Sequence, residues 1–237
     1  MRHINSASRW LAGFVLGILL ALAGGRAIAA TCVPVDWPLW SDFKTHFVKP
    51  DGRVVDASTP QLHSSSEGQS YAMFFALVAN DPSAFDKLWR WSVNNLAEGD
   101  AGAVLPAWIW GRADDGAWRV LDPNSASDAD LWFVYSLLEA GRLWSRPDYI
   151  RDAMRLLALV EQKEIAFLPG LGPMLLPGPV GFEQPNRIWQ LNPSYLPVPV
   201  LRRLATASPA APWAGIAANT ARLITSVTPK GFIADWV

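Results

Sequence analysis

Two short segments of this chain place carboxylates among small residues at the start of apolar stretches. The first is Ser66-Glu67-Gly68-Gln69-Ser70-Tyr71-Ala72-Met73, and the second is Ala126-Ser127-Asp128-Ala129-Asp130. In each segment the carboxylates fall in the first turn of an expected helix. Partial burial would hold the pKa of Glu67 high, although the positive end of the helix dipole opposes this. A protonated carboxyl beside an ionised one can perform general acid–base catalysis.

Residue types alone leave a simpler interpretation open for these segments. Ser66-Glu67 and Ser127-Asp128 could be helix caps and first-turn acids, which satisfy free N–H groups and the helix dipole. The chain also contains 13 tryptophans. Because indole rings stack well on sugar rings, carboxylates combined with many tryptophans favour chemistry on a sugar.

The elements that position these residues are mostly helical. Helical periodicity or long apolar runs predict helices at about 38–48, 67–79, 82–97, 128–144, 147–164, 193–207 and 213–226. Short β segments are expected near 107–111 and 117–121, and most of the 19 prolines and 17 glycines fall in the loops between elements. Sequential helices with long loops indicate an α/α architecture.

Several aromatic and polar residues are candidates for ligand contact. Trp108 and Trp110 flank Ile109 in a predicted loop or edge strand, where one indole could lie against a sugar ring; burial in the core is the alternative. Tyr195 follows Asn192-Pro193-Ser194 and could reach a sugar, with a capped turn as the alternative. Gln69 and Asp130 are candidate hydroxyl-binding groups.

Longer motifs around these residues resemble glycoside hydrolase family 8, and within it the bacterial endoglucanases associated with cellulose synthesis. Ser65 to Asp81 looks like the general-acid segment of that family. Ala126-Ser127-Asp128-Ala129-Asp130, with Ser136-Leu137-Leu138-Glu139-Ala140 and Trp144, looks like its aspartate motif. Three further stretches look similar to the same enzymes: 105–111, 169–178 and 192–197.

The resemblance implies an (α/α)6 barrel and an endo-β-1,4-glucanase that acts on cellulose by an inverting acid/base mechanism. Glu67 would be the general acid. Asp128 would be the base or nucleophile of the aspartate motif, or would instead hold the sugar ring distorted while a downstream aspartate deprotonates water. The partners implied are β-1,4-glucan chains and a cellulose synthase complex.

Two departures from the family pattern stand out. Phe133-Val134 replaces the usual Ile/Met-Ala, which we interpret as a packing difference. Family members also continue beyond Val237, so we expect residues 30–237 to be the N-terminal part of the catalytic domain and the barrel to be incomplete in this chain.

The N-terminus has the pattern of a secretory signal peptide at residues 1–29. Arg2 and Arg9 precede or open an apolar run that ends near Ala23, and Ala27-Ile28-Ala29 offers small residues for cleavage. The run is too short for a comfortable membrane span, so we expect an exported protein, periplasmic or secreted, without stable membrane insertion after signal removal.

Charge and cysteine content restrict the remaining function classes. Removal of residues 1–29 would take away three of the 20 basic residues and none of the 21 acidic ones. The resulting net charge of −4 argues against a nucleic-acid partner. The histidines and the single cysteine, Cys32, lack metal-ligand spacing, and no nucleotide-binding motif occurs, so neither a metal nor a cofactor is expected.

Two other functions are compatible with parts of the pattern. A non-catalytic glycan-binding component of a cellulose export system would use the same aromatic cleft, and an inactive truncated enzyme would carry the same motifs. A polysaccharide lyase with an α/α fold would need a Tyr, His or Lys base and basic residues facing uronates, of which this acidic chain offers few.

Overall fold

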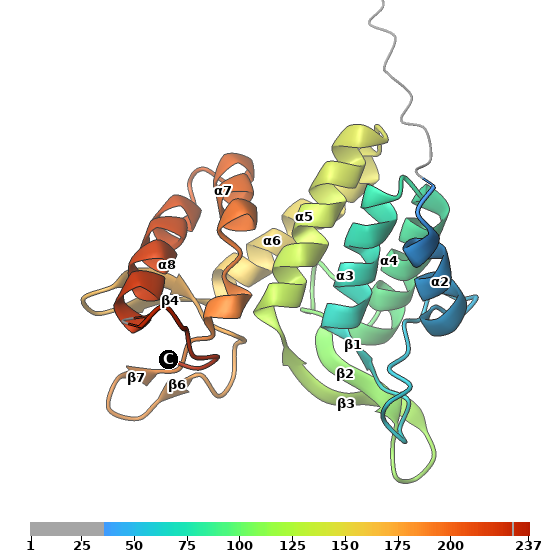
Figure 1. The fold of residues 1–237 in the computed structure, drawn as a ribbon, viewed down its shortest axis with the longest axis horizontal. Helices are drawn as coiled ribbons and strands as arrows, with labels where there is room; N and C mark the ends of the chain where they lie inside the picture. Colours follow the sequence, from blue (N-terminus) through green and yellow to red (C-terminus); the bar gives the residue numbers. More distant parts are fainter. Residues whose placement is uncertain (1–35, 229) are drawn as a thin grey trace, which may run out of the picture. The chain divides into compact units, whose positions relative to one another are not determined.

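The computed structural model describes residues 36–228 and 230–237. These residues form a mainly helical unit with short strands between the helices (Figure 1). The predicted signal peptide at 1–29 and Cys32 lie outside the described residues. The seven α-helices of the described part are α2 (Pro38–Phe47), α3 (Ser66–Val78), α4 (Pro82–Leu96), α5 (Ser127–Leu143), α6 (Pro147–Lys163), α7 (Val198–Ala207) and α8 (Trp213–Val227).

Six of the seven predicted helices are confirmed within one or two residues. The exception is the single helix expected at 193–207, which is divided into a short 3-10 helix (Pro193–Tyr195) and α7. Pro197 causes the division, because it has no N–H to donate and adopts an extended conformation with ψ of 98°. The predicted helix was therefore wrong at this point.

Helices α3 and α5 form the centre of the unit. Helix α3 packs against α4 and α5, and α5 also packs against α6 and α7. Most of α5 is buried, including Leu131, Phe133, Val134 and Leu137. Helices α4 and α6 are amphipathic, with a buried stripe facing α3 and α5 and an exposed polar face. The departure at Phe133-Val134 is thus accommodated inside the core, where both side chains are fully buried.

A three-stranded antiparallel sheet joins the starts of α3 and α5. Its strands are β1 (Ser64–Ser65), β2 (Ala107–Arg112) and β3 (Trp118–Ser125), in that order. Strand β1 runs directly into α3, and β3 is followed after one residue by α5. Because β2 pairs with both, the sheet holds the two helix N-termini at the same end of the fold (Figure 1).

Two hairpins follow α6. Strands β4 (Ile165–Leu168) and β5 (Gly172–Leu175) form one, and β6 (Glu183–Gln184) and β7 (Ile188–Trp189) form the other. Neither was predicted. Gly170 and Gly172 have φ of 80° and 104°, which permits the tight connection between β4 and β5. No helix among the described residues is long and apolar enough to cross a membrane.

Candidate active site

Glu67 lies in the first turn of α3. Ser65 caps the helix by accepting a hydrogen bond from the Gly68 N–H over 3.1 Å. The Glu67 carboxylate accepts hydrogen bonds from Trp108 Nε1 (2.9 Å, to Oε1) and from Ser66 Oγ (3.2 Å, to Oε2). Burial raises the pKa of Glu67, the negative charge of Asp128 raises it further, and the hydrogen bonds from Ser66 and Trp108 oppose the rise. The net upward shift favours the protonated form that a general acid needs.

Asp128 lies in the first turn of α5 and is 5 % exposed. Its Oδ2 accepts a hydrogen bond of 2.6 Å from the Tyr71 hydroxyl, whereas no donor among the described residues reaches Oδ1. Burial raises the pKa of Asp128, and the hydrogen bond from Tyr71 works in the opposite direction. Asp128 and Glu67 are close enough for the charge of one to affect the other.

Tyr71 is the functional candidate that the sequence analysis missed. It stands four residues after Glu67 on α3, so both side chains lie on the same face of that helix. This spacing was the available signal. Burial and the hydrogen bond to Asp128 raise the pKa of Tyr71 above its ordinary value, so the hydroxyl stays protonated and acts as a donor.

Tyr195 belongs to the same group of side chains. Its hydroxyl is half-buried, and burial together with the charges of Asp128 and Glu67 raises its pKa to about 12. The 3-10 helix that carries it begins with a cap in which Asn192 Oδ1 accepts from the Ser194 N–H over 3.0 Å. Tyr195 is therefore both part of a capped turn and a neighbour of the two carboxyls.

Trp108 and Trp110 have different surroundings although they are two residues apart. The β2–β3 register shifts on both sides of Ile109, so the strand bulges between them. Trp108 is 41 % exposed and donates to Glu67. The ring of Trp110 instead contacts Trp91, lies stacked on Trp118, and has the Arg53 guanidinium 4.5 Å from its centre. Of the two rings, only Trp108 lies beside a candidate catalytic carboxyl.

Gln69 occupies a structural position that corrects its expected role in hydroxyl binding. It is fully buried, and its Oε1 accepts from the Val54 N–H. Its Nε2 donates to Ser92 Oγ at 3.1 Å and to the Gly52 and Leu88 carbonyls at 3.3 Å each. With these partners, the amide has no free donor to offer a sugar.

Asp130 is also fully buried, which corrects its expected contact with substrate. Its carboxyl lies within hydrogen-bonding reach of Glu164, the C-cap residue that follows α6 and is equally buried. Glu164 was not singled out from the sequence, because it lies outside every recognised motif.

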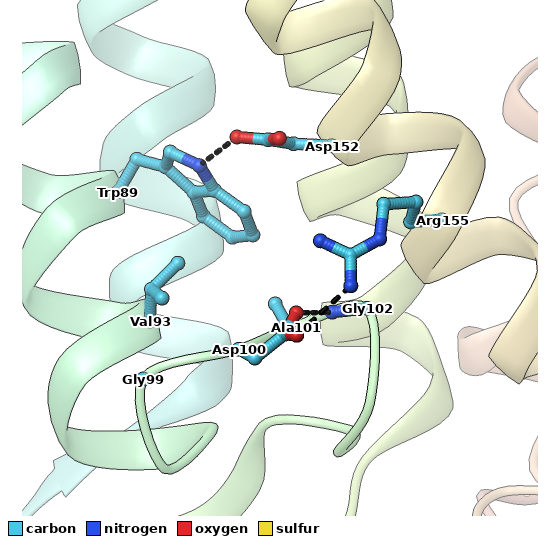
Figure 2. A pocket seen from close by; sticks show the side chains of 8 residues that line it. All are labelled: Trp89, Val93, Gly99, Asp100, Ala101, Gly102, Asp152 and Arg155. Atoms are coloured by element: carbon cyan, nitrogen blue, oxygen red, sulfur yellow. Dashed lines mark hydrogen bonds and ion pairs between the residues drawn. The ribbon is translucent and has the colours of Figure 1, made fainter.

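A small cavity of about 140 Å³ lies away from this group, between α4, α6 and the loop at 99–102. Figure 2 shows Trp89 directed towards Asp152 and Arg155 towards Asp100. The charged and polar groups that line this cavity are thus paired with one another, and these pairs link α4, α6 and the loop at 99–102. Among the described residues, no group of three or more histidine, cysteine or acidic side chains is arranged to hold a metal.

Comparison with known proteins identifies the family. The model of the glycosyl hydrolases family 8 matches residues 14–237. The chain belongs to glycosyl hydrolase family 8. An endoglucanase from Xanthomonas axonopodis pv. citri (strain 306) is 54 % identical over 225 residues, which cover 95 % of this chain and 58 % of the relative. An endoglucanase from Escherichia coli (strain K12) is 46 % identical over 225 residues, with 95 % and 59 % covered.

Solved family 8 structures are similar to this one. The endo-1,4-D-glucanase from Vibrio fischeri ES114 superposes with a TM-score of 0.83 at 48 % identity, covering 85 % of this chain and 58 % of that one. The endo-beta-1,4-glucanase CMCax from Acetobacter xylinum gives a TM-score of 0.74 at 31 % identity, covering 83 % and 60 %. The resemblance to family 8 and the predicted (α/α)6 fold class are therefore confirmed. The chain spans between a half and two thirds of the length of these relatives.

Proposed function

We propose that this protein is an endo-β-1,4-glucanase that hydrolyses cellulose chains by an inverting acid/base mechanism. The observation that carries the proposal is the pairing of Glu67 and Asp128 at the joined N-termini of α3 and α5, with an exposed indole beside the acid. Membership of family 8 and the endoglucanase names of its relatives support the same activity.

Glu67 is the general acid in this mechanism. Burial and the charge of Asp128 raise its pKa, which favours the protonated form that donates a proton to the glycosidic oxygen as the bond breaks. Trp108 holds the carboxyl in place through Oε1, and the exposed part of its ring offers a stacking surface for a glucose unit.

Asp128 supplies the second carboxyl of the site. An inverting pair stands roughly 6.5–9.5 Å apart, so that a water molecule fits on the far side of the sugar. Asp128 either activates this water or holds the sugar ring in a distorted geometry. In both roles it must be ionised, and the hydrogen bond from Tyr71 favours the ionised form.

Substrates with different leaving groups test the role of Glu67. We expect Glu67→Gln to lower the hydrolysis of carboxymethyl cellulose by the full-length protein about 10²- to 10⁴-fold, the range typical of general acid catalysis. An aryl cellobioside with an acidic phenol should lose far less, because its leaving group needs little protonation. Glu98→Gln, an exposed change just after α4, is the matched control. Equal losses on both substrates would refute the assignment.

Rescue by azide separates the two roles of Asp128. If Asp128 is the base, Asp128→Ala leaves a space beside the reacting carbon in which azide can attack without deprotonation, and turnover on the activated cellobioside returns with a glycosyl azide product. If Asp128 instead holds the ring, azide produces no such product. Full turnover by Asp128→Ala without azide would exclude both roles.

The cellular setting is part of the same proposal. Residues 1–29 act as a signal peptide, the catalytic domain begins at residue 30, and the exported protein works on glucan chains beside a cellulose synthase complex. The basic and apolar pattern of the first 23 residues supports export. N-terminal sequencing of the protein recovered from the periplasm or medium tests it, with Ala30 expected as the first residue.

A further inference from the structure

Two buried carboxyls behind the candidate site have no role in the mechanism above. Asp130 lies one turn into α5, Glu164 caps the end of α6, and both are fully buried. The side chains of Asp130 and Glu164 are within hydrogen-bonding reach of each other. Ser125 Oγ donates to Glu164 Oε1 over 2.6 Å.

The hydrogen bonds around the two carboxyls are incomplete if both are ionised. Among the described residues, no N–H or hydroxyl donates to either oxygen of Asp130 or to Glu164 Oε2. An ionised carboxylate can accept hydrogen bonds but cannot donate one, so a hydrogen bond between the two side chains requires a proton on one of them. A single proton would satisfy one oxygen of each residue and leave one negative charge instead of two. Burying two unpaired like charges costs far more.

The charges that face the pair favour retention of this proton. Asp128 on α5 and Glu67 on α3 add negative charge to the surroundings of Asp130. The charge of Asp128 also raises the pKa of Glu164, whereas the positive charge of Lys163 on α6 lowers it. Burial is the largest cause, and it raises the pKa of both Asp130 and Glu164.

The location of the pair links it to Asp128. The segment 176–177 also links the start of α5 to the end of α6: the Ser127 N–H donates to the Pro177 carbonyl over 3.0 Å, and the Leu176 N–H to the Glu164 carbonyl over 2.8 Å. Asp130 is only two residues from Asp128 on the same helical turn. A shift of Asp130 would therefore move the Asp128 carboxyl relative to Tyr71 and Glu67.

We propose that Asp130 and Glu164 share one proton at neutral pH, and that this hydrogen bond fixes the first turn of α5 so that Asp128 is held in its working position. Asp130 and Glu164 are positioning residues and do not touch the substrate. The positioning role rests on the proposed function of Asp128, whereas the shared proton does not.

Infrared spectroscopy detects the proton directly. A protonated carboxyl has a carbonyl stretching band apart from the carboxylate bands, and the band moves in D2O. In a Glu67→Gln/Asp128→Asn background, which removes the two site carboxyls whose pKa is also raised, we expect this band at pH 7. It should vanish on adding either Asp130→Asn or Glu164→Gln, because the amide then donates to a fully ionised partner. Adding Asp114→Asn, an exposed change in the β2–β3 turn, should leave the band.

Kinetics of the full-length protein test the positioning role. Asp130→Ala and Glu164→Ala should lower kcat on carboxymethyl cellulose about 10- to 100-fold with little change in KM, since misplacement of a catalytic group by about 1 Å has an effect of this size. Asp130→Asn and Glu164→Gln should restore most of kcat, because an amide replaces the protonated carboxyl as donor. Because they lack the shared proton, these amide variants should also lose less stability than wild type as pH rises from 5 to 8.

The two parts of the proposal fail separately. A missing infrared band, together with an equal loss of stability in wild type and the amide variants as pH rises from 5 to 8, overturns the shared proton. Folded alanine variants with wild-type kcat overturn the positioning role. If the alanine variants do not fold, the amide variants Asp130→Asn and Glu164→Gln give the answer, because they keep the hydrogen bond. A low kcat in these folded variants would also overturn the positioning role. An inactive wild type with the band present contradicts only the proposed function.

Discussion

The indole nitrogen of Trp108, on β2, donates a hydrogen bond of 2.9 Å to Oε1 of Glu67, on α3. The two residues are 41 positions apart, and the pairing of β1 with β2 brings them together. A single side chain thus presents an exposed ring to the solvent and affects the proton affinity of the candidate acid.

Trp108→Phe is expected to raise the pKa of Glu67, because it removes a hydrogen bond that stabilises the ionised carboxylate. The alkaline limb of kcat/KM, where the acid loses its proton, should move to higher pH. A pH–rate profile on cello-oligosaccharides measures the shift. Trp118→Phe is the control, since Trp118 is similarly exposed on β3 and its ring contacts Trp110 and Arg53. An unmoved alkaline limb would contradict the prediction.

Tyr71→Phe should likewise raise the pKa of the other carboxyl, Asp128. Loss of the 2.6 Å hydrogen bond removes a group that lowers the pKa of Asp128, so Asp128 ionises at higher pH and the acidic limb of the profile moves upward. A hydrogen bond to a charged group contributes about 1.5–3 kcal/mol, so we expect kcat at pH values on the acidic limb to fall about tenfold or more. Tyr135→Phe on α5, whose ring packs against Phe74, is the control. Equal profiles for the two variants would refute the role of Tyr71.

Alanine variants of the two β2 tryptophans should separate binding from stability. Trp108→Ala is expected to weaken cello-oligosaccharide binding by about 1–3 kcal/mol, as for bases stacked on aromatic side chains. Trp110→Ala should instead lower the free energy of unfolding by about 3 kcal/mol, since it empties the space between Trp91, Trp118 and Arg53. Calorimetric titration and denaturant unfolding of both variants test this. The reverse pattern would make Trp110 the sugar platform.

Gln69→Leu should destabilise the fold without changing the chemistry of the site. The substitution leaves the Val54 N–H and the Ser92 hydroxyl short of a buried partner, and each such group costs about 1–3 kcal/mol. Gln162→Leu, on the exposed side of α6, should have little effect. A soluble Gln69→Leu protein with unchanged stability but weaker substrate binding would show that Gln69 binds substrate after all.

The raised pKa values of Glu67 and Asp128 also predict how stability depends on pH. A carboxyl whose folded pKa lies above its unfolded value of about 4 binds protons more tightly in the native state. The native state therefore loses stability as the pH rises from the unfolded pKa to the folded pKa. The double variant Glu67→Gln/Asp128→Asn should therefore be more stable than wild type at pH 7, and the gain should shrink towards pH 4. A gain that grows on acidification would show that the pKa values are lowered instead.

Local sequence signals were sufficient for most of the helices. Some helices have a clear start in the sequence, such as Asp81 and Pro82 at α4 or Pro147 at α6, and the structure begins these helices there. The strands β4 to β7 were missed because they are two to four residues long and their pairing depends on tertiary contacts. Pro197 carried a usable signal, because a proline interrupts helical hydrogen bonding.

The candidate site was predictable only in part. Glu67 and Asp128 were recognised as first-turn acids within motifs, and their joint position depends on the sheet, which no local pattern describes. Gln69 and Asp130 occur within the same motifs but point into the core. Proximity in sequence could not separate residues that face a ligand from residues that support them, since a helix turns by 100° at each residue.

The antiparallel sheet that joins the starts of α3 and α5 has a kinetic consequence. The α3–α4 and α5–α6 pairs rely on contacts between chain neighbours, whereas the hydrogen bond from Tyr71 to Asp128 spans 57 positions. Contacts that are distant in sequence require the closure of long loops and form more slowly than local ones. The helical pairs are therefore expected to assemble before the two carboxyls meet. During partial denaturation, we expect the contacts between the two carboxyl-bearing segments to be lost before the helical pairs. Catalytic activity should then disappear while much of the helical circular dichroism is still present.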